Sequence, residues 1–167
     1  MTTMINHVRA MAGYNRWMNQ KLYEICVNIS DAERKRDAGA FFKSIHGTLN
    51  HILLADKVWM GRFTGRPATF KSLDQELYAN FITLRKEREK QDQAIISWVA
   101  SLQDSDLGND LTFTAMTSPI TRTYPLWFVL SHFFNHQTHH RGQVTTLIKQ
   151  LDIDPGITDL LMLPEFQ

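Results

Sequence analysis

The stretch "VLSHFFNHQTHHRGQVTTL" (residues 129–147) decides the fold class, because its apolar residues recur with a helical period. A single stripe at steps of three and four residues contains Val129, Phe133, His136, His140, Val144, Leu147 and, just beyond, Leu151. The stretch also holds four of the chain's seven histidines. It predicts a long helix, starting at Thr123 or Pro125 and ending near Leu151, that carries imidazoles into the protein core.

The spacing of these histidines points to a metal site without requiring one. His136 and His140 are four residues apart, so both rings lie on one helix face, where two imidazoles can share an ion. His132 lies one turn earlier near the same stripe, and His139 lies about a quarter-turn away. Core histidines can also simply hydrogen-bond a neighbour. One physical point favours a metal, because two adjacent buried imidazoles without a shared partner carry a desolvation cost that a divalent cation removes.

A third ligand is expected from another helix, and His51 is the leading candidate. It shares one face of a helix expected from about Ser44 to Phe63 with Leu54, Ala55 and Val58. His46 is less well aligned with that face, and His7 lies at the edge of the first helix. Spacing alone leaves the choice between a metal site and a hydrogen-bonded core open.

Two further helices complete the pattern. The first follows a stripe of Met4, Val8, Met11, Asn15, Met18, Leu22, Ile25 and Ile29. The other is expected to be capped by Ser72 and Gln75 and to reach Leu102, with "RKEREKQDQ" (85–93) largely exposed to solvent. Short alternation around Ser118-Pro119 predicts a loop or a small hairpin. The pattern predicts an all-α four-helix bundle forming one domain over residues 1–167.

Composition excludes several other classes of protein. The chain has 18 basic and 17 acidic residues, so its net charge of +1 gives no electrostatic case for nucleic acid or an anionic membrane. The N-terminus lacks the apolar core of a signal peptide, and no long apolar run predicts a membrane span. The single cysteine, Cys26, falls in an apolar helical run, which predicts a core residue and a cytoplasmic protein.

Three segments together resemble a known family. These are "YNRWMN" (14–19), "SIHGTLNHILLADKVW" (44–59) and "HFFNHQTHHRGQV" (132–144), which occur in family order and extend the likeness over essentially the whole chain. They resemble the DinB/YfiT-like superfamily of metal-binding bundles. The resemblance implies an up-down-down-up four-helix bundle, commonly dimeric, with a divalent metal held by His51, His136 and His140. His132, His139 and His46 fall beside these positions and are not assigned to the metal.

The resemblance also implies a chemistry. Three protein ligands leave an open coordination position, as in catalytic sites. All-imidazole ligation suits zinc, nickel, copper or iron, of which we expect zinc, nickel or iron. Characterised relatives include metal-dependent transferases and isomerases that use low-molecular-weight thiols. The implied function is therefore an enzyme that activates a small thiol for transfer to an electrophilic small molecule. The alternatives are a hydrolase using bound hydroxide and a non-enzymatic, metal-stabilised dimer or binding protein.

Several polar residues keep two interpretations, and no catalytic residue is assigned. Asn15 interrupts an apolar stripe, which predicts a buried hydrogen bond, with substrate contact as the alternative. Asp56 is expected either to orient a ligand imidazole or to form a salt bridge. Arg141 and Gln143 can bond loop carbonyls or a substrate carboxylate.

A homodimer is expected partly from the resemblance and partly from the surplus of large apolar residues. The chain has four tryptophans and ten phenylalanines, which is many for one small bundle. A tightly packed monomer is the alternative.

Overall fold

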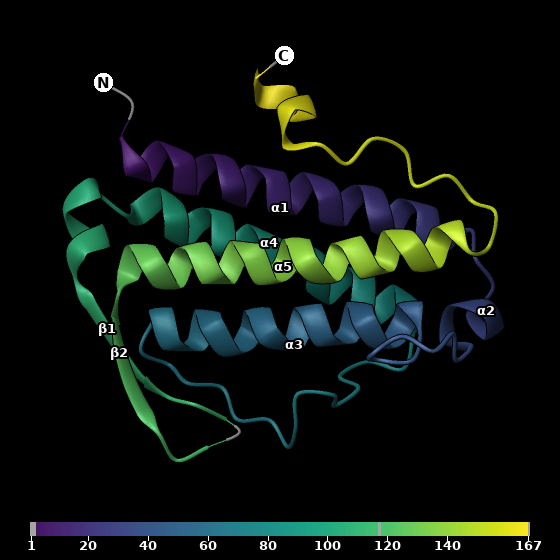
Figure 1. Ribbon diagram of the computed structural model, residues 1–167, viewed down its shortest axis with the longest axis horizontal. Coiled ribbons are helices and arrows are strands. Elements are labelled where there is room, and N and C mark those ends of the chain that lie inside the picture. Colours follow the sequence, from purple (N-terminus) through teal and green to yellow (C-terminus); the bar gives the residue numbers. More distant parts are fainter. Residues whose placement is uncertain (1–2, 117, 167) are drawn as a thin grey trace.

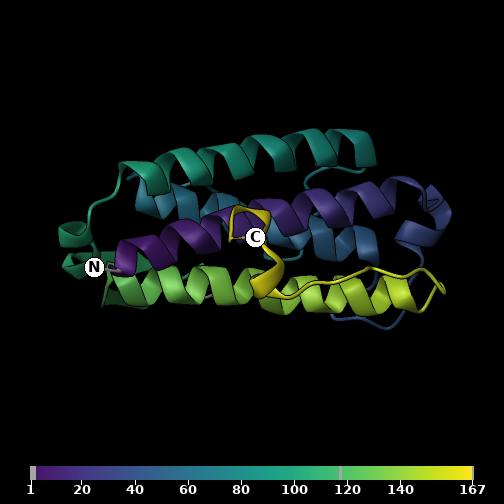
Figure 2. The same cartoon turned by 90° about the horizontal axis from the view of Figure 1, so that it is seen from above.

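Four long helices dominate the computed structural model, which describes residues 3–116 and 118–166 (Figure 1). They are α1 (Met4–Val27), α3 (Ile45–Phe63), α4 (Phe81–Ser101) and α5 (Leu126–Lys149), with a short α2 (Asp31–Lys35) between the first two. Both α1 and α3 pack against α4 and α5, which closes a four-helix arrangement. Helices α1 and α5 run in one direction along the bundle, and α3 and α4 run in the other (Figures 1 and 2).

The description of the chain as all-α is not exact, because the segment before α5, predicted as a loop or a small hairpin, forms a two-stranded sheet. Strands β1 (Asp110–Thr114) and β2 (Thr121–Pro125) pair antiparallel, with Asp110 opposite Pro125 and Thr114 opposite Thr121. Threonine hydroxyls bond across the ladder, with 2.8 Å between Thr112 Oγ1 and Thr123 Oγ1. Because residues from Thr121 to Pro125 pair in this ladder, α5 begins at Leu126 and not at Thr123. The fold is therefore mostly helical with a two-stranded hairpin.

The expected start of the third long helix is also wrong. The Ser72 and Gln75 pair forms only a local turn, in which the Gln75 amide donates to the Ser72 carbonyl at 3.4 Å. Helix α4 begins at Phe81, where the Asn80 side chain accepts from the Thr83 amide at 2.9 Å. Residues 64–80 instead form a long loop along α3 (Figure 1).

A tertiary contact explains why this loop is not helical. The side chain of Asn50, buried on α3, accepts hydrogen bonds from the amides of Leu77 and Tyr78 at 2.9 and 3.0 Å. These amides are thus satisfied by a distant side chain and need no helical partner. Helix α3, by contrast, begins where the sequence predicts, directly after Ser44, whose side chain accepts from the Gly47 amide at 3.0 Å.

Two apolar clusters fill the two halves of the bundle. One is built around Leu22, Leu53 and Ile148, and the other around Ile95, Leu130 and Phe133. Cys26 is fully buried in the first cluster, where burial raises the pKa of its thiol to about 12. The expectation that Cys26 is a core residue is therefore confirmed.

A layer of buried charge separates the two clusters along each helix. Arg88 is 2% exposed and donates from Nη1 to Asp56 Oδ2 at 2.6 Å, while its Nη2 lies 2.9 Å from Asp92 Oδ1. Asn19 also donates to Asp92 Oδ1, at 2.9 Å. The expectation that residues 85–93 are largely exposed is wrong at Arg88, Gln91 and Asp92, because these polar groups find partners on neighbouring helices.

Contacts in the same layer decide between the two interpretations given above for Asn15 and for Asp56. Asn15 is buried, donates to Asp92 Oδ1 at 3.3 Å and accepts from Arg141, so the expected buried hydrogen bond is confirmed. Asp56 accepts from Arg88 and, at 2.7 Å, from Gln137, so it forms the salt bridge and does not orient an imidazole.

The C-terminal segment crosses the outer face of α1 (Figure 2). It contains the short turns η2 (Leu160–Met162) and η3 (Pro164–Phe166), after η1 (Asp104–Gly108) earlier in the chain. Tyr14 Oη donates to the Thr158 carbonyl at 2.5 Å, and Leu163 is 1% exposed. Among the described residues, no helix combines the length and apolarity that a bilayer crossing requires.

Candidate metal centre

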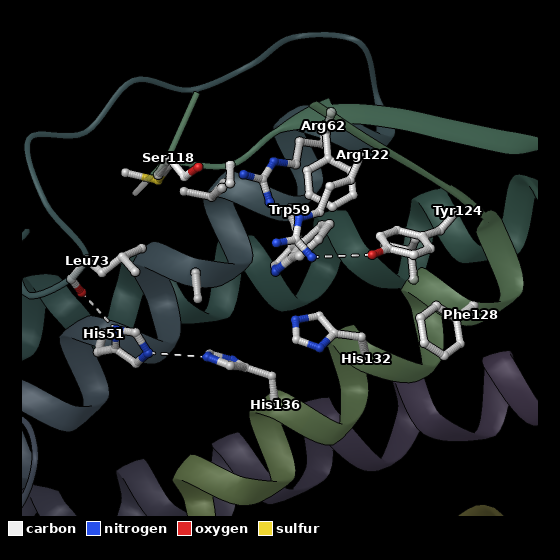
Figure 3. Close-up of a pocket in the computed structure, with 16 residues that line it drawn as sticks. His51, Trp59, Arg62, Leu73, Ser118, Arg122, Tyr124, Phe128, His132 and His136 are labelled. Atoms are coloured by element: carbon white, nitrogen blue, oxygen red, sulfur yellow. Dashed lines mark hydrogen bonds between the residues drawn. The ribbon is translucent and has the colours of Figure 1, made fainter. Parts of the chain in front are cut away.

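Three histidines from two helices converge on one point. His51 comes from α3, and His136 and His140 come from α5. Each offers a ring nitrogen, and these nitrogens all lie within 4.8 Å of one another. Figure 3 shows His51 and His136 facing each other, with 3.3 Å between their Nε2 atoms. The structure therefore brings together all three residues that the sequence nominates.

The N-terminus of α3 places an aromatic ring against this cluster. A Cβ on Gly47 would lie 2.2 Å from the Phe42 carbonyl oxygen, so only glycine admits this approach of the preceding segment. The Phe42 ring stacks on His51 with 3.7 Å between centroids, and it meets His140 edge-on at 5.5 Å. Phe42 thus shields one side of the imidazoles from water.

The long loop determines the tautomer of His51. Its Nδ1 lies 2.8 Å from the Leu73 carbonyl oxygen (Figure 3). A carbonyl can only accept, so Nδ1 carries the proton and the Nε2 lone pair of the neutral ring faces the cluster. Leu73 is a residue that sequence reasoning missed, because its backbone acts and not its side chain.

A glutamine plays the equivalent part for His140. Gln143 Oε1 accepts from His140 Nδ1 at 2.9 Å, and Gln143 Nε2 donates to His139 Nε2 at 3.2 Å. Since His140 bonds through Nδ1, its Nε2 lone pair is free for an ion. Gln143 was left unassigned from the sequence, although its position one turn after His140 on α5 is the signal that could have identified this contact.

Burial keeps the cluster neutral. Desolvation, together with the neighbouring His140 and His51, lowers the pKa of His136 to about 3. Desolvation also lowers the pKa of His51 to about 4, and it lowers the pKa of His140. Metal binding requires unprotonated imidazole, so this environment favours coordination over a wide pH range. Three neutral rings with convergent nitrogens, two of them oriented by hydrogen bonds, fit a divalent ion.

The remaining histidines lie outside the group. His46 is buried and donates from Nε2 to the Tyr78 carbonyl at 2.9 Å, so it helps to hold the loop. His139 is exposed, and His7 lies on α1 beside a different pocket. His132 is the nearest, with its ring centroid 6.0 Å from that of His136 and 5.3 Å from that of Trp59.

Two pockets meet at the histidines. One, of about 440 Å³, lies between the hairpin and helices α3 and α5 (Figure 3). The other, of about 1050 Å³, is formed by the Phe41-Phe42 segment, residues 68–74 and α5. His51 and His136 line both pockets. The cluster is therefore accessible from two sides.

The fold and the site define a class of protein, a helical bundle with a three-histidine cluster between two of its helices that could hold a metal ion. The model of the DinB family matches residues 4–167, and the chain belongs to the DinB family. It is also similar to the protein named Protein DinB of Bacillus subtilis (strain 168). The two are 26% identical over 152 residues, which cover 87% of each chain.

Proposed function

We propose that this chain is a metal-dependent enzyme that activates a small thiol for transfer to an electrophilic small molecule. The observation that carries the proposal is the convergence of three neutral imidazoles where two pockets meet. His51, His136 and His140 would hold one divalent ion, for which zinc, nickel or iron are the candidates. When bound, such an ion lowers the pKa of a thiol or water at its open position.

The protein's own residues support a thiol supplied from outside. The chain's single cysteine, Cys26, is buried in the core and its pKa is raised to about 12, so it cannot supply a thiolate at the site. The larger pocket carries the polar side chains of Lys71, Ser72, Asp74 and Gln143, which suit a polar, low-molecular-weight thiol. Phe42 lines this pocket and excludes water from one side of the histidines.

Two pockets suit a reaction of two substrates. In the proposed transfer, the thiol sulfur forms a bond to the electrophilic carbon, and that carbon's bond to its leaving group breaks with its electron pair. The thiol proton passes to solvent. The chain holds the two reactants side by side, which replaces a bimolecular encounter with an oriented one.

Metal content tests the first part of the proposal. Protein purified without chelators should carry about one divalent ion per chain. Both His51→Ala and His140→Ala should lose most of the affinity, while His139→Ala is the matched control and should retain it. Elemental analysis that finds no ion, followed by titration without uptake, would contradict the proposal.

Cobalt substitution tests the thiol. Addition of cysteine or glutathione to the cobalt form should produce a thiolate-to-metal charge-transfer band, which should be absent from the His136→Ala protein. A hydrolase would show only a pH-dependent change in coordination and no band with thiol. A structural metal would show neither, and its removal would lower stability without abolishing any turnover.

A further inference from the structure

The smaller pocket is lined by two arginines and by several aromatic side chains. Arg62, near the end of α3, and Arg122, on β2, both line it (Figure 3). In the part of the chain that the structure describes, its lining includes no aspartate or glutamate. The aromatic residues of its wall are Trp59, Phe113, Tyr124 and Phe128.

Arg62 is held between two rings. Its guanidinium carbon lies 4.4 Å from the Trp59 ring centroid and 4.5 Å from that of Phe113, and Nη2 donates to the Thr114 carbonyl at 3.2 Å. This packing fixes the guanidinium without neutralising it. Burial lowers the pKa of Arg62, which is the sign of a cation short of a compensating anion.

Arg122 likewise has a hydrogen-bond partner but, among the described residues, no ion-pair partner. Its Nη1 lies 3.4 Å from the hydroxyl oxygen of Tyr124 (Figure 3). Within residues 3–116 and 118–166, neither Arg62 nor Arg122 forms a salt bridge with a carboxylate. Two guanidinium groups that line one pocket and lack an acidic partner favour an anionic ligand.

A path of ring contacts connects this charge to the histidines. Arg62 lies over the Trp59 ring. The centroid of that ring lies 5.3 Å from the centroid of His132, which in turn lies 6.0 Å from that of His136. A ligand with its anionic end at the arginines therefore has its body on an aromatic wall and its other end near His136. The pocket volume of about 440 Å³ falls within the usual range for small-molecule sites.

We propose that this pocket binds the electrophilic substrate as a carboxylate, held by Arg62 and Arg122, with an apolar or aromatic body packed along Trp59. This inference rests on the proposed function and names the class of its second substrate. The larger pocket remains for the thiol.

The test uses 2-naphthoate and its uncharged analogue 2-naphthamide as probes, with isothermal titration calorimetry on the purified protein. The naphthoate should bind about tenfold or more tightly than the amide, because charge-assisted hydrogen bonds are stronger than neutral ones. Both Arg62→Met and Arg122→Met should weaken naphthoate binding by about tenfold and leave naphthamide binding unchanged. Arg66→Met, in the exposed part of the loop and outside the pocket wall, is the matched control and should bind like the unmodified protein.

Three results would overturn the inference: no naphthoate binding, equal binding of the acid and the amide, or naphthoate affinity unchanged in both pocket variants. The last would mean that the carboxylate is held elsewhere, such as at the histidines. Arg122 is exposed, so its variant tests the idea even if Arg62→Met is destabilised. Naphthoate binding without a thiol band in the cobalt protein would sink the proposed function alone, and a thiol band without naphthoate binding would sink this inference alone.

Discussion

Two of the three imidazoles, those of His51 and His140, are each oriented by one hydrogen bond opposite the metal-facing nitrogen. His51 donates to a backbone carbonyl at Leu73, whereas His140 donates to the side chain of Gln143. Only the second of these partners can be removed by substitution. Such partners fix the ring and raise the basicity of the ligating nitrogen.

We therefore expect Gln143→Leu to weaken zinc binding by about 10-fold to 100-fold. His140 then loses the acceptor that holds its proton on Nδ1. Competition with a chromophoric chelator measures the affinity, and Gln20→Leu, an exposed position on α1, serves as the control. Indistinguishable affinities for the two variants would show that Gln143 does not orient the ligand.

The depressed pKa values predict acid sensitivity of the metal-free protein. In the unfolded chain His51 and His136 titrate near 6.5, whereas in the folded protein their pKa values are about 4 and about 3. Between the folded and the unfolded pKa values, the unfolded chain binds more protons than the folded protein does. The free energy of unfolding should therefore fall as pH decreases from about 6.5 towards 4. Denaturant unfolding of chelator-treated protein across this range measures the slope. His136→Phe should make the slope shallower, and an unchanged slope would contradict the prediction.

Among the elements, the start of α3 and the loop of residues 64–80 together position His51. Ser44 caps α3, so the helix register that places His51 is set locally. The loop of residues 64–80 supplies the Leu73 carbonyl, and Asn50 and His46 hold its far end through Leu77 and Tyr78. The position of one ligand thus depends on a segment that follows it in sequence by about 22 residues.

Replacement of two helical glycines by alanine should change the stability of the protein in opposite directions. Gly47→Ala would place a methyl group against the Phe42 carbonyl, so we expect a loss of roughly 1–3 kcal/mol of stability and weaker metal binding as Phe42 moves from His51. Gly142→Ala meets open space on α5 and should raise stability by roughly 0.5–1 kcal/mol. Urea unfolding of both variants tests the pair. A neutral Gly47→Ala would mean that the segment around Phe42 is free to adjust.

At the scale of the whole molecule, the buried polar layer joins the four helices. Arg88 of α4 pairs with Asp56 of α3 and with Asp92 one turn further along α4. Breaking such a pair leaves an uncompensated charge in the interior, which is strongly destabilising. The layer also lies beside the site in sequence, since Gln137 follows His136 directly and donates to Asp56.

Arg88→Met should therefore cost about 3–5 kcal/mol of stability. Arg85→Met on the same helix is the matched control, because Arg85 forms exposed ion pairs with Glu24 and Glu89 at 2.8 and 3.1 Å. Its loss should cost less than about 1 kcal/mol. Denaturant unfolding measures both, and equal costs would show that the buried pair contributes no more than a surface one.

The homodimer remains a prediction at this scale. Met4 and Trp127, on α1 and α5, are 52% and 41% exposed and line a common surface pocket, which is a place where a second copy could bury apolar area. Light scattering should give twice the mass of the chain. A monomer mass across a wide concentration range would count against the dimer.

The long helices α1, α3 and α5 could be predicted from the sequence, which also nominated the three histidines that the structure brings together. Helical periodicity is local, so the stripe through His136 and His140 can be recognised without knowing what packs against it. The position of Asn15 in an apolar stripe likewise indicated its buried hydrogen bond, because a polar residue at a core position needs a partner.

The surroundings of those histidines could not be predicted from the sequence and are seen only in the folded chain. Leu73, Phe42 and Arg62 reach the site or its pocket from separate segments, and no local pattern encodes their approach. The sequence pattern predicted that Arg88 and Asp92 are exposed to solvent, because hydropathy takes no account of a polar or charged partner on another helix. The Ser72 and Gln75 pattern predicted a helix start, but the amides of Leu77 and Tyr78 bond instead to the Asn50 side chain on α3. These features depend on which groups meet across the bundle, and that is a property of packing and not of any one segment.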